Sequence, residues 1–294
     1  MINTNSKFLG HILALLTSIV WGTTLVSTKI LLKNFQPVEI LFIRFLIALL
    51  LFYIVCPQKT PKTTKSQKLT ISLAGLTGIT SYYLFENIAL TYTFATNVSI
   101  INCSAPFLTA IFTFYFFKNN EKINRNFFIG FLVSIIGIWI ILFNGNKINL
   151  NPLGDVLAIC AATSWAFYSI LIKKTSNYNI PTLIITRESF LYGIIFMIPF
   201  LFLFNFKMGL SRFLDITNLL NILFLGFIAS GVCFFTWNKS IKILGTVKSG
   251  CYIYLIPVVT VILSSIILKE PVSALLIMGI ILTISGLVIS EFRK

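Results

Sequence analysis

Two charged side chains, Arg44 and Glu86, stand inside long apolar runs of this sequence. Charged groups within a bilayer are costly and usually face a cavity or a partner of opposite charge. The guanidinium of arginine offers a fork of donors that suits a carboxylate, and a carboxyl group can carry a proton. One interpretation gives Arg44 the task of receiving an anionic group of a substrate and makes Glu86 a proton-coupling residue. The alternative is a static ion pair that joins two helices.

Helix geometry places these two residues at similar depths. Arg44 lies about eight residues from the start of its apolar run, and Glu86 lies about six residues from the end of the next run. At about 1.5 Å per residue, both would sit roughly 9–12 Å below the same membrane surface. We therefore expect the two side chains to face the interior of the protein and to interact.

Two tryptophans and three asparagines are further candidates for a substrate site. Tryptophan is a common anchor at membrane interfaces, but Trp165 lies about 12 residues into an apolar run of about 20, near mid-membrane, and Trp21 is also inside a run. Deep tryptophans of this kind either line a cavity, where they stack on an apolar or aromatic substrate, or pack helices together. Asparagines within the spans either line the substrate path or bond across helices. These are Asn87, Asn102 and Asn238.

The elements that must position these residues are long apolar helices. The chain has 294 residues, 57% hydrophobic and 11% charged, with a mean hydropathy of +0.93. Soluble domains carry about 25% charged residues, so an integral membrane protein is expected. Runs of about 20 apolar residues are long enough to cross a hydrocarbon core. They predict ten spans, at about 8–31, 37–56, 69–91, 97–117, 127–143, 153–172, 181–204, 217–237, 249–268 and 272–290.

The basic residues are distributed unevenly between the two sets of loops. Fifteen fall in the set that includes the termini and the stretch from Lys59 to Lys68, and six fall in the opposite set, which includes Lys147. Because cytoplasmic loops are enriched in basic residues, we expect both termini on the cytoplasmic side of the cell membrane. The net charge of +15 then serves topology and contact with anionic lipid, and no nucleic-acid partner is expected.

The sequence repeats itself in two halves, 1–146 and 147–294. Trp21 recurs as Trp165 after 144 residues, and Pro106 recurs as Pro257 after 151. Each half holds five expected spans, and an odd number of spans places the two copies in opposite orientations. The sequence therefore predicts an all-α integral membrane protein with ten transmembrane helices, built as an inverted repeat of two five-helix units. Such repeats usually house a substrate site near the midplane, where the halves meet.

Matched positions in the two halves indicate where helices bend and where they pack. A proline inside a helix removes one backbone hydrogen bond and kinks the helix, so Pro106 and Pro257 are predicted hinges, with fixed curvature as the alternative. Stripes of small residues in the fifth and tenth spans predict close packing, within the protein or between protomers. These stripes are Gly130, Ser134 and Gly137, matched by Gly279, Thr283 and Gly286.

Several motifs resemble a known family. The stretch from Glu86 to Thr93, followed by Ala95, Ser99 and Pro106, resembles the signature of EamA-type members of the drug/metabolite transporter superfamily. The second copy of that signature is similar to Trp237-Asn238-Lys239 and Tyr254-Leu255-Ile256-Pro257. The resemblance covers essentially the whole chain. It implies a ten-helix carrier with a central cavity formed mainly by the first four helices of each half, moving amino acids, other metabolites or drugs, often outward.

These observations predict a secondary active transporter that exports small metabolites, such as amino acids or drug-like compounds, by alternating access. A passive facilitator of the same fold is the alternative. A membrane-embedded enzyme would need a nucleophile with a base, or a cluster of metal ligands, which one histidine and five scattered cysteines do not provide. No Gly-x-x-x-x-Gly-Lys-Ser/Thr motif for ATP occurs. The expected partners are a small-molecule substrate, a coupling proton and the lipid bilayer, and no cofactor is expected.

Overall fold

The computed structural model describes residues 4–117, 125–142, 152–207 and 209–291, and these residues form helices and the loops that join them. A helix satisfies its backbone hydrogen bonds within one segment, which apolar surroundings require. The helices of the first half are α1 (Thr4–Leu31), α2 (Pro37–Val55), α3 (Lys65–Gly75), η1 (Leu76–Ser81), α4 (Tyr82–Tyr92), α5 (Ala95–Asn102), α6 (Ala105–Phe117) and α7 (Arg125–Leu142).

The second half follows the same order, with three extra short helices, η2, η4 and η5. Its helices are α8 (Pro152–Thr175), α9 (Thr182–Leu203), η2 (Leu210–Leu214), α10 (Ile216–Leu223), η3 (Phe224–Val232), α11 (Cys233–Leu244), α12 (Thr246–Gly250), η4 (Cys251–Tyr254), α13 (Leu255–Leu263), η5 (Ser264–Leu268) and α14 (Ala274–Glu291).

Local sequence signals fix several helix ends. Pro37 stands at the start of α2, and the backbone N–H of Gln36 donates to Oε2 of Glu39 at 2.8 Å, which satisfies a donor that the helix itself leaves free. Helix α11 ends at Gly245, whose φ of 87° favours glycine because a Cβ atom is strained there. The chain then turns directly into α12.

The third and eighth expected spans each pass through a π-helical segment. Helix α3 continues through η1 into α4, and α10 continues through η3 into α11. Wider π turns of this kind are frequent at functional sites. In both halves the helix after the π segment carries conspicuous buried residues, Glu86 and Asn87 in α4 and Trp237 and Asn238 in α11.

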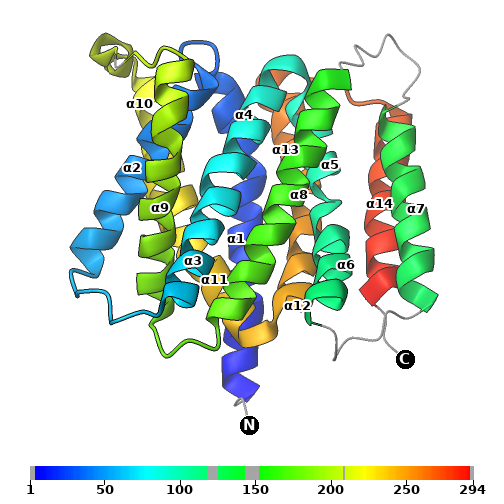
Figure 1. The fold of residues 1–294 in the computed structure, drawn as a ribbon. Coiled ribbons are helices and arrows are strands. Elements are labelled where there is room, and N and C mark those ends of the chain that lie inside the picture. The colour runs from blue at the N-terminus through cyan, green and yellow to red at the C-terminus, as the bar shows by residue number, and fades with distance from the viewer. Residues whose placement is uncertain (1–3, 118–124, 143–151, 208, 292–294) are drawn as a thin grey trace.

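The two halves of the chain pack into each other. Helix α4 lies against α8 and α11 lies against α1, while α6 contacts α8 and α13 contacts α1. Every one of these pairs joins one half to the other, and the largest cluster of buried apolar side chains contains residues of both halves. Figure 1 shows the N-terminus and the α8–α9 connection at the same end of the bundle, so α1 and α8 run in opposite directions.

Helices α7 and α14 form a pair at one edge of the bundle (Figure 1). Their small residues allow close contact: a Cβ atom added at Gly137 would lie 2.5 Å from Oγ1 of Thr283, and one added at Gly286 would lie 2.4 Å from Oγ of Ser134. The Ser134 hydroxyl also donates to the Thr283 carbonyl at 2.9 Å. The two stripes therefore pack on each other within one chain.

Seven helices in the described part of the chain are long and apolar enough to cross a membrane. They correspond to seven of the ten expected spans. The expected span 69–91, which is α3, η1 and α4, is not among them, because serine, threonine and tyrosine make it less apolar. The described part of α14 contributes only a shorter apolar helix, Ala274–Gly286.

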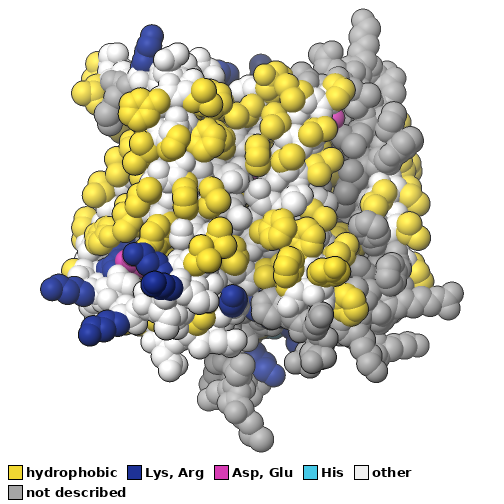
Figure 2. Space-filling view, viewed as in Figure 1, with side chains coloured by type: hydrophobic (Ala, Val, Ile, Leu, Met, Phe, Trp, Pro, Cys, Tyr) yellow, Lys and Arg dark blue, Asp and Glu magenta, His cyan; other side chains and the backbone are white. Residues whose placement is uncertain are grey.

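The surface agrees with a membrane environment. Hydrophobic side chains cover the middle of the face in Figure 2, and lysine and arginine side chains lie toward its two ends. Many large apolar side chains of the protein are exposed, for example Leu50, Ile54 and Phe202. A soluble monomer seldom exposes so much contiguous apolar surface, so this face fits contact with lipid.

Candidate functional site: a central pocket between the two halves

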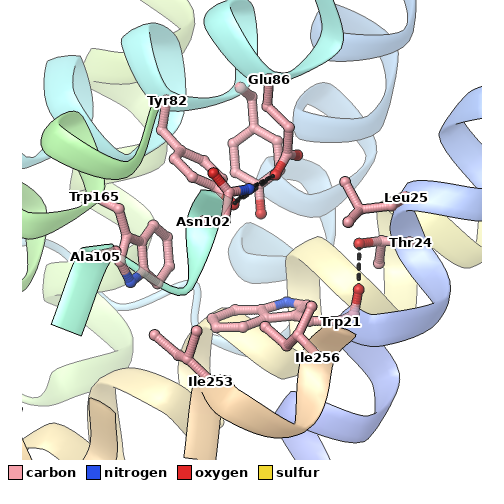
Figure 3. A pocket seen from close by; sticks show the side chains of 11 residues that line it. Trp21, Thr24, Leu25, Tyr82, Glu86, Asn102, Ala105, Trp165, Ile253 and Ile256 are labelled. Atoms are coloured by element: carbon pink, nitrogen blue, oxygen red, sulfur yellow. Dashed lines mark hydrogen bonds between the residues drawn. The ribbon is translucent and has the colours of Figure 1, made fainter. Parts of the chain in front are cut away.

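A pocket lies where the two halves meet, and we call it the central pocket (Figure 3). The first half contributes Trp21 from α1, Glu86 from α4 and Asn102 from α5. The second half contributes Trp165 from α8 and the aliphatic side chains of η4 and α13. The cavity measures about 30 Å³, which is room for one or two water molecules. This space is too small for a metabolite, so a substrate can enter only after side chains or helices move.

Aromatic rings form one wall of the central pocket. Trp21 and Trp165 meet edge to face, with ring centroids 5.2 Å apart, and Tyr82 lies 5.0 Å from Trp165. The indole N–H of Trp21 donates to the carbonyl of Ala229 at 3.0 Å. The buried indole nitrogen of Trp165 has no hydrogen-bond partner among the described residues. The two repeat-related tryptophans thus lie together in the structure, one with a donor that remains unused.

Glu86 is the acidic side chain of the central pocket. It is 3% exposed, and its Oε1 accepts hydrogen bonds from the Tyr82 hydroxyl at 2.6 Å and from Nδ2 of Asn102 at 2.9 Å. Figure 3 shows the three side chains converging on one point. Within the described residues, no hydrogen bond reaches Oε2. The carboxyl group is therefore held firmly through one oxygen and keeps the other available.

Arg44 lies outside the central pocket and does not pair with Glu86. Its Nε donates to Oγ of Ser230 at 2.9 Å, and its guanidinium carbon lies 4.5 Å from the centre of the Tyr83 ring. Tyr83 in turn contacts Tyr82, the partner of Glu86. Depth along a helix does not fix the direction in which a side chain points. Arg44 and Glu86 are both buried, as expected, and their charges interact through space, but they form no direct ion pair among the described residues.

Two of the three asparagines bond across helices instead of lining the pocket. Nδ2 of Asn87 donates to the carbonyl of Pro37 at 3.1 Å. Asn238 accepts from the Tyr168 hydroxyl at 2.8 Å and donates to Oγ1 of Thr186 at 2.9 Å. Both side chains are 0% exposed, and neither lines the central pocket. Their position favours the alternative that they join helices.

The comparisons with known proteins agree with this architecture. The family model of the EamA-like transporter family matches residues 8–143 and, a second time, residues 152–292. The chain belongs to the EamA-like transporter family. A crystal structure with 16% sequence identity has a TM-score of 0.72 and aligns over 96% of both chains, which shows a shared fold.

Several relatives of this EamA-like protein are named as transporters. It is 30% identical to an uncharacterized transporter of Archaeoglobus fulgidus over 297 residues, 99% of each chain. It is 26% identical to a probable amino-acid metabolite efflux pump of Salmonella typhimurium, over 95% of this chain and 94% of the relative. A protein of the same name from Escherichia coli is 25% identical, over 96% of this chain and 94% of the relative.

The two prolines of this EamA-like protein lie beside breaks in the expected spans. Pro106 is the second residue of α6, directly after the turn that ends α5, and Pro257 is the third residue of α13, after the tight helix η4. Gly250 of α12 lies close to Pro106, since a Cβ atom added to it would be 3.5 Å from the proline ring. Their role as hinges stays a prediction.

Sequence reasoning missed the tyrosines of the site. Tyr82 lies four residues before Glu86, and residues four apart share one face of a helix, so this spacing was a usable signal. It also missed Tyr83, which connects Arg44 to the aromatic wall. Among the described residues, no three His, Cys, Asp or Glu side chains gather as a metal site would require.

A second hollow, which we call the lysine hollow, lies between α1, α4 and the η5–α14 connection. It measures about 590 Å³ and is lined by Lys29, Lys33, Lys269 and Glu270 together with apolar side chains. Both oxygens of Glu270 are occupied. Oε1 accepts from the backbone N–H of Ala95 at 2.9 Å, and Oε2 accepts from the N–H and the hydroxyl of Thr96 at 3.2 and 2.7 Å.

Glu270 thereby ties the second half of the chain to the first residues of α5. Negative charge is favourable at the N-terminus of a helix, where backbone N–H groups are free. Lys269 has a φ of 56°, a left-handed conformation that residues other than glycine seldom adopt. This turn lies directly before Glu270. This contact could not be expected from residue spacing, because it joins residues 175 positions apart.

Proposed function

We propose that this EamA-like protein is a secondary active transporter that exports small metabolites, amino acids or drug-like compounds, across the cytoplasmic membrane by alternating access. The observation that carries the proposal is the central pocket, which both halves build and in which the two repeat-related tryptophans meet. Substrate sites at the interface of two repeats are typical of secondary transporters. The names of the Salmonella and Escherichia relatives support export.

The proposed architecture has ten spans in two inverted five-helix repeats. Three observations support it. The family model matches the chain twice, α1 and α8 run in opposite directions (Figure 1), and the contacts of α4 with α8 and of α11 with α1 are related by exchange of the halves. Rocking of one half against the other would open the small central pocket to each side in turn.

The proposed topology places both termini in the cytoplasm. It rests on the excess of basic residues in one set of loops. In a variant without native cysteines, a cysteine at Lys62 should resist a membrane-impermeant thiol reagent added outside cells. A cysteine at Lys147, which lies outside the described residues, should react. The reverse pattern would overturn the topology.

The proposed substrate site is tested by transport after reconstitution. Counterflow in liposomes, measured against a panel of amino acids and drug-like compounds, should identify a transported solute. Replacing Trp165 by alanine should lower counterflow about tenfold, because it removes the ring that stacks on the solute. Phe167→Ala is the matched control: this aromatic residue lies on the same helix but is 36% exposed and outside the pocket. Equal loss in both variants would contradict the assignment.

A passive facilitator of the same fold is the second candidate. The small volume of the cavity argues only against an open channel. The two differ in one measurement. A coupled exporter accumulates solute above equilibrium when a pH gradient is imposed, whereas a facilitator only equilibrates it.

A further inference from the structure

We propose that the central pocket binds the positively charged nitrogen of an amine substrate, and that Oε2 of Glu86 is its acceptor. The inference rests on the proposed function and adds a substrate class to it. It begins with the hydrogen bonds of the carboxyl group. The bonds from Tyr82 and Asn102 both end on Oε1, which leaves Oε2 without a partner among the described residues.

The charges around Glu86 point the same way. Among the described residues, no lysine or arginine lines the central pocket, and no basic side chain forms a direct ion pair with Glu86. Burying a carboxylate without a partner of opposite charge is costly. The charge of the buried Arg44 acts on Glu86 through space, but its guanidinium donates to Ser230 and lies over the Tyr83 ring, and it makes no direct contact with the carboxylate among the described residues. A ligand that brings its own positive charge removes this cost.

The pocket walls suit an organic cation. The rings of Trp21, Trp165 and Tyr82 gather around the space beside Glu86 (Figure 3). Aromatic faces attract ammonium groups, most strongly those of tryptophan and most strongly where water is excluded. The rings also offer apolar surface to the rest of the ligand. Among the described residues the pocket is lined by one acid, four aromatic residues and no base, and such a lining selects an amine with an apolar body.

The same arrangement disfavours anions. A carboxylate in the pocket would lie close to the carboxylate of Glu86, which Tyr82 and Asn102 hold in place. Like charges repel strongly in a cavity that excludes water. The pocket should therefore rank three ligands of equal shape by charge: an amine first, an alcohol second and a carboxylate last.

Equilibrium binding to the purified protein tests this ranking without transport. The probes are phenethylamine, phenethyl alcohol and phenylpropionate, which share one ring and differ in the end group, with quenching of tryptophan fluorescence as the readout. The wild-type protein should bind phenethylamine about tenfold or more tightly than phenethyl alcohol, the size of effect expected for a bond to a buried charged group. Equal affinity for all three probes would overturn the proposal.

Variants assign the preference to the residue. In Glu86→Gln the advantage of the amine over the alcohol should disappear. Glu86→Asp keeps the charge and should keep the order of the probes. Glu188→Gln is the control, because it removes one acidic charge at a site that contacts Thr60 and Arg187 and lies outside the pocket. An unchanged amine preference in folded Glu86→Gln would overturn the assignment.

Two further results separate this inference from the proposed function. Should Glu86→Gln fail to fold, the wild-type ranking and Glu86→Asp still decide: equal binding of the three probes by the wild type, or loss of the amine preference in folded Glu86→Asp, overturns the inference. Amine-selective binding without counterflow of any amine would leave the subsite standing and refute transport. Counterflow of phenylpropionate as fast as that of phenethylamine would leave transport standing and refute the subsite.

Discussion

The central pocket and the lysine hollow are neighbours of opposite character. Leu25 of the pocket and Lys29 of the hollow lie one turn apart on α1, and Glu86 and Leu90 have the same relation on α4. One helical turn is about 5.4 Å, so both spaces lie along the same pair of helix faces. The pocket is small and holds an acid without a base, whereas the hollow is large and holds three lysines.

Each region contains one buried glutamate, and the two use their oxygens differently. Both carboxylate oxygens of Glu270 accept hydrogen bonds from the first residues of α5. In Glu86, Oε1 accepts hydrogen bonds from Tyr82 and Asn102, and Oε2 accepts none from the described residues. The comparison teaches that burial alone does not reveal the role of a carboxylate. The oxygen that the protein itself leaves unused is the one that marks a ligand site.

An apolar layer separates the two regions. Leu25 and Leu90 are both buried and pack in one cluster with Ala95 and Val98, and Leu268 packs against it. The side chain of Lys29 crosses the edge of this layer, since its Nζ donates to the carbonyls of Leu90 and Thr93. In an alternating cycle, this layer would be the seal between the central pocket and the lysine hollow.

Of the substitutions in the two regions, replacement of Glu270 should lower the free energy of unfolding most. Replacing Glu270 by alanine removes three hydrogen bonds to a charged group and should lower the free energy of unfolding by about 2–4 kcal/mol. Thermal unfolding in detergent measures this loss. Glu270→Gln keeps one acceptor oxygen and should lose less. A Glu270→Ala protein as stable as the wild type would refute the structural role of this residue.

A smaller effect on stability is expected at Glu86. Glutamine retains the oxygen that accepts from Tyr82 and Asn102 and removes an unpaired buried charge, so Glu86→Gln should change the free energy of unfolding by no more than about 1 kcal/mol. Since Arg44 does not pair with Glu86, the additional change Arg44→Gln should not be needed for folding. Thermal unfolding of the single and double variants checks both points. Rescue of an unstable Glu86→Gln protein by Arg44→Gln would restore the ion-pair interpretation.

The smallest effect is expected at the exposed lysines of the hollow. Lys33 and Lys269 are exposed, so the double change to glutamine should alter the free energy of unfolding by less than about 0.5 kcal/mol. Transport of a cationic solute should speed up a few-fold at low salt, because the change removes two positive charges that repel it, and the difference should vanish at high salt because ions screen exposed charges. Initial rates at two salt concentrations measure it. A salt-independent difference would contradict a purely electrostatic role.

The helices and the repeat could be predicted from the sequence, because hydrophobic length and residue spacing are local properties. The expected span 37–56 corresponds to α2, Pro37–Val55, and the shift of 144 residues related Trp21 to Trp165, which the structure brings into contact. Inverted orientation and the total of ten spans remain proposals supported by the double match of the family model.

The side-chain partners could not be predicted, because they depend on how helices rotate about their axes. Similar depth suggested a pair of Arg44 with Glu86, yet Arg44 points to Ser230 of the other half and to the Tyr83 ring. Asn87 and Asn102 had the same two interpretations in the sequence. The structure separates them, since Asn102 holds Glu86 in the pocket, whereas Asn87 bonds to the backbone of α2.

The most direct test of coupled transport through the central pocket is accumulation in proteoliposomes under an imposed pH gradient. The wild-type protein should concentrate a solute found by counterflow above its equilibrium level. Glu86→Gln should abolish this accumulation and still exchange the solute at saturating concentration, because exchange needs only that the loaded pocket alternates between the two sides. Full pH-driven accumulation by a well-folded Glu86→Gln protein would contradict the account.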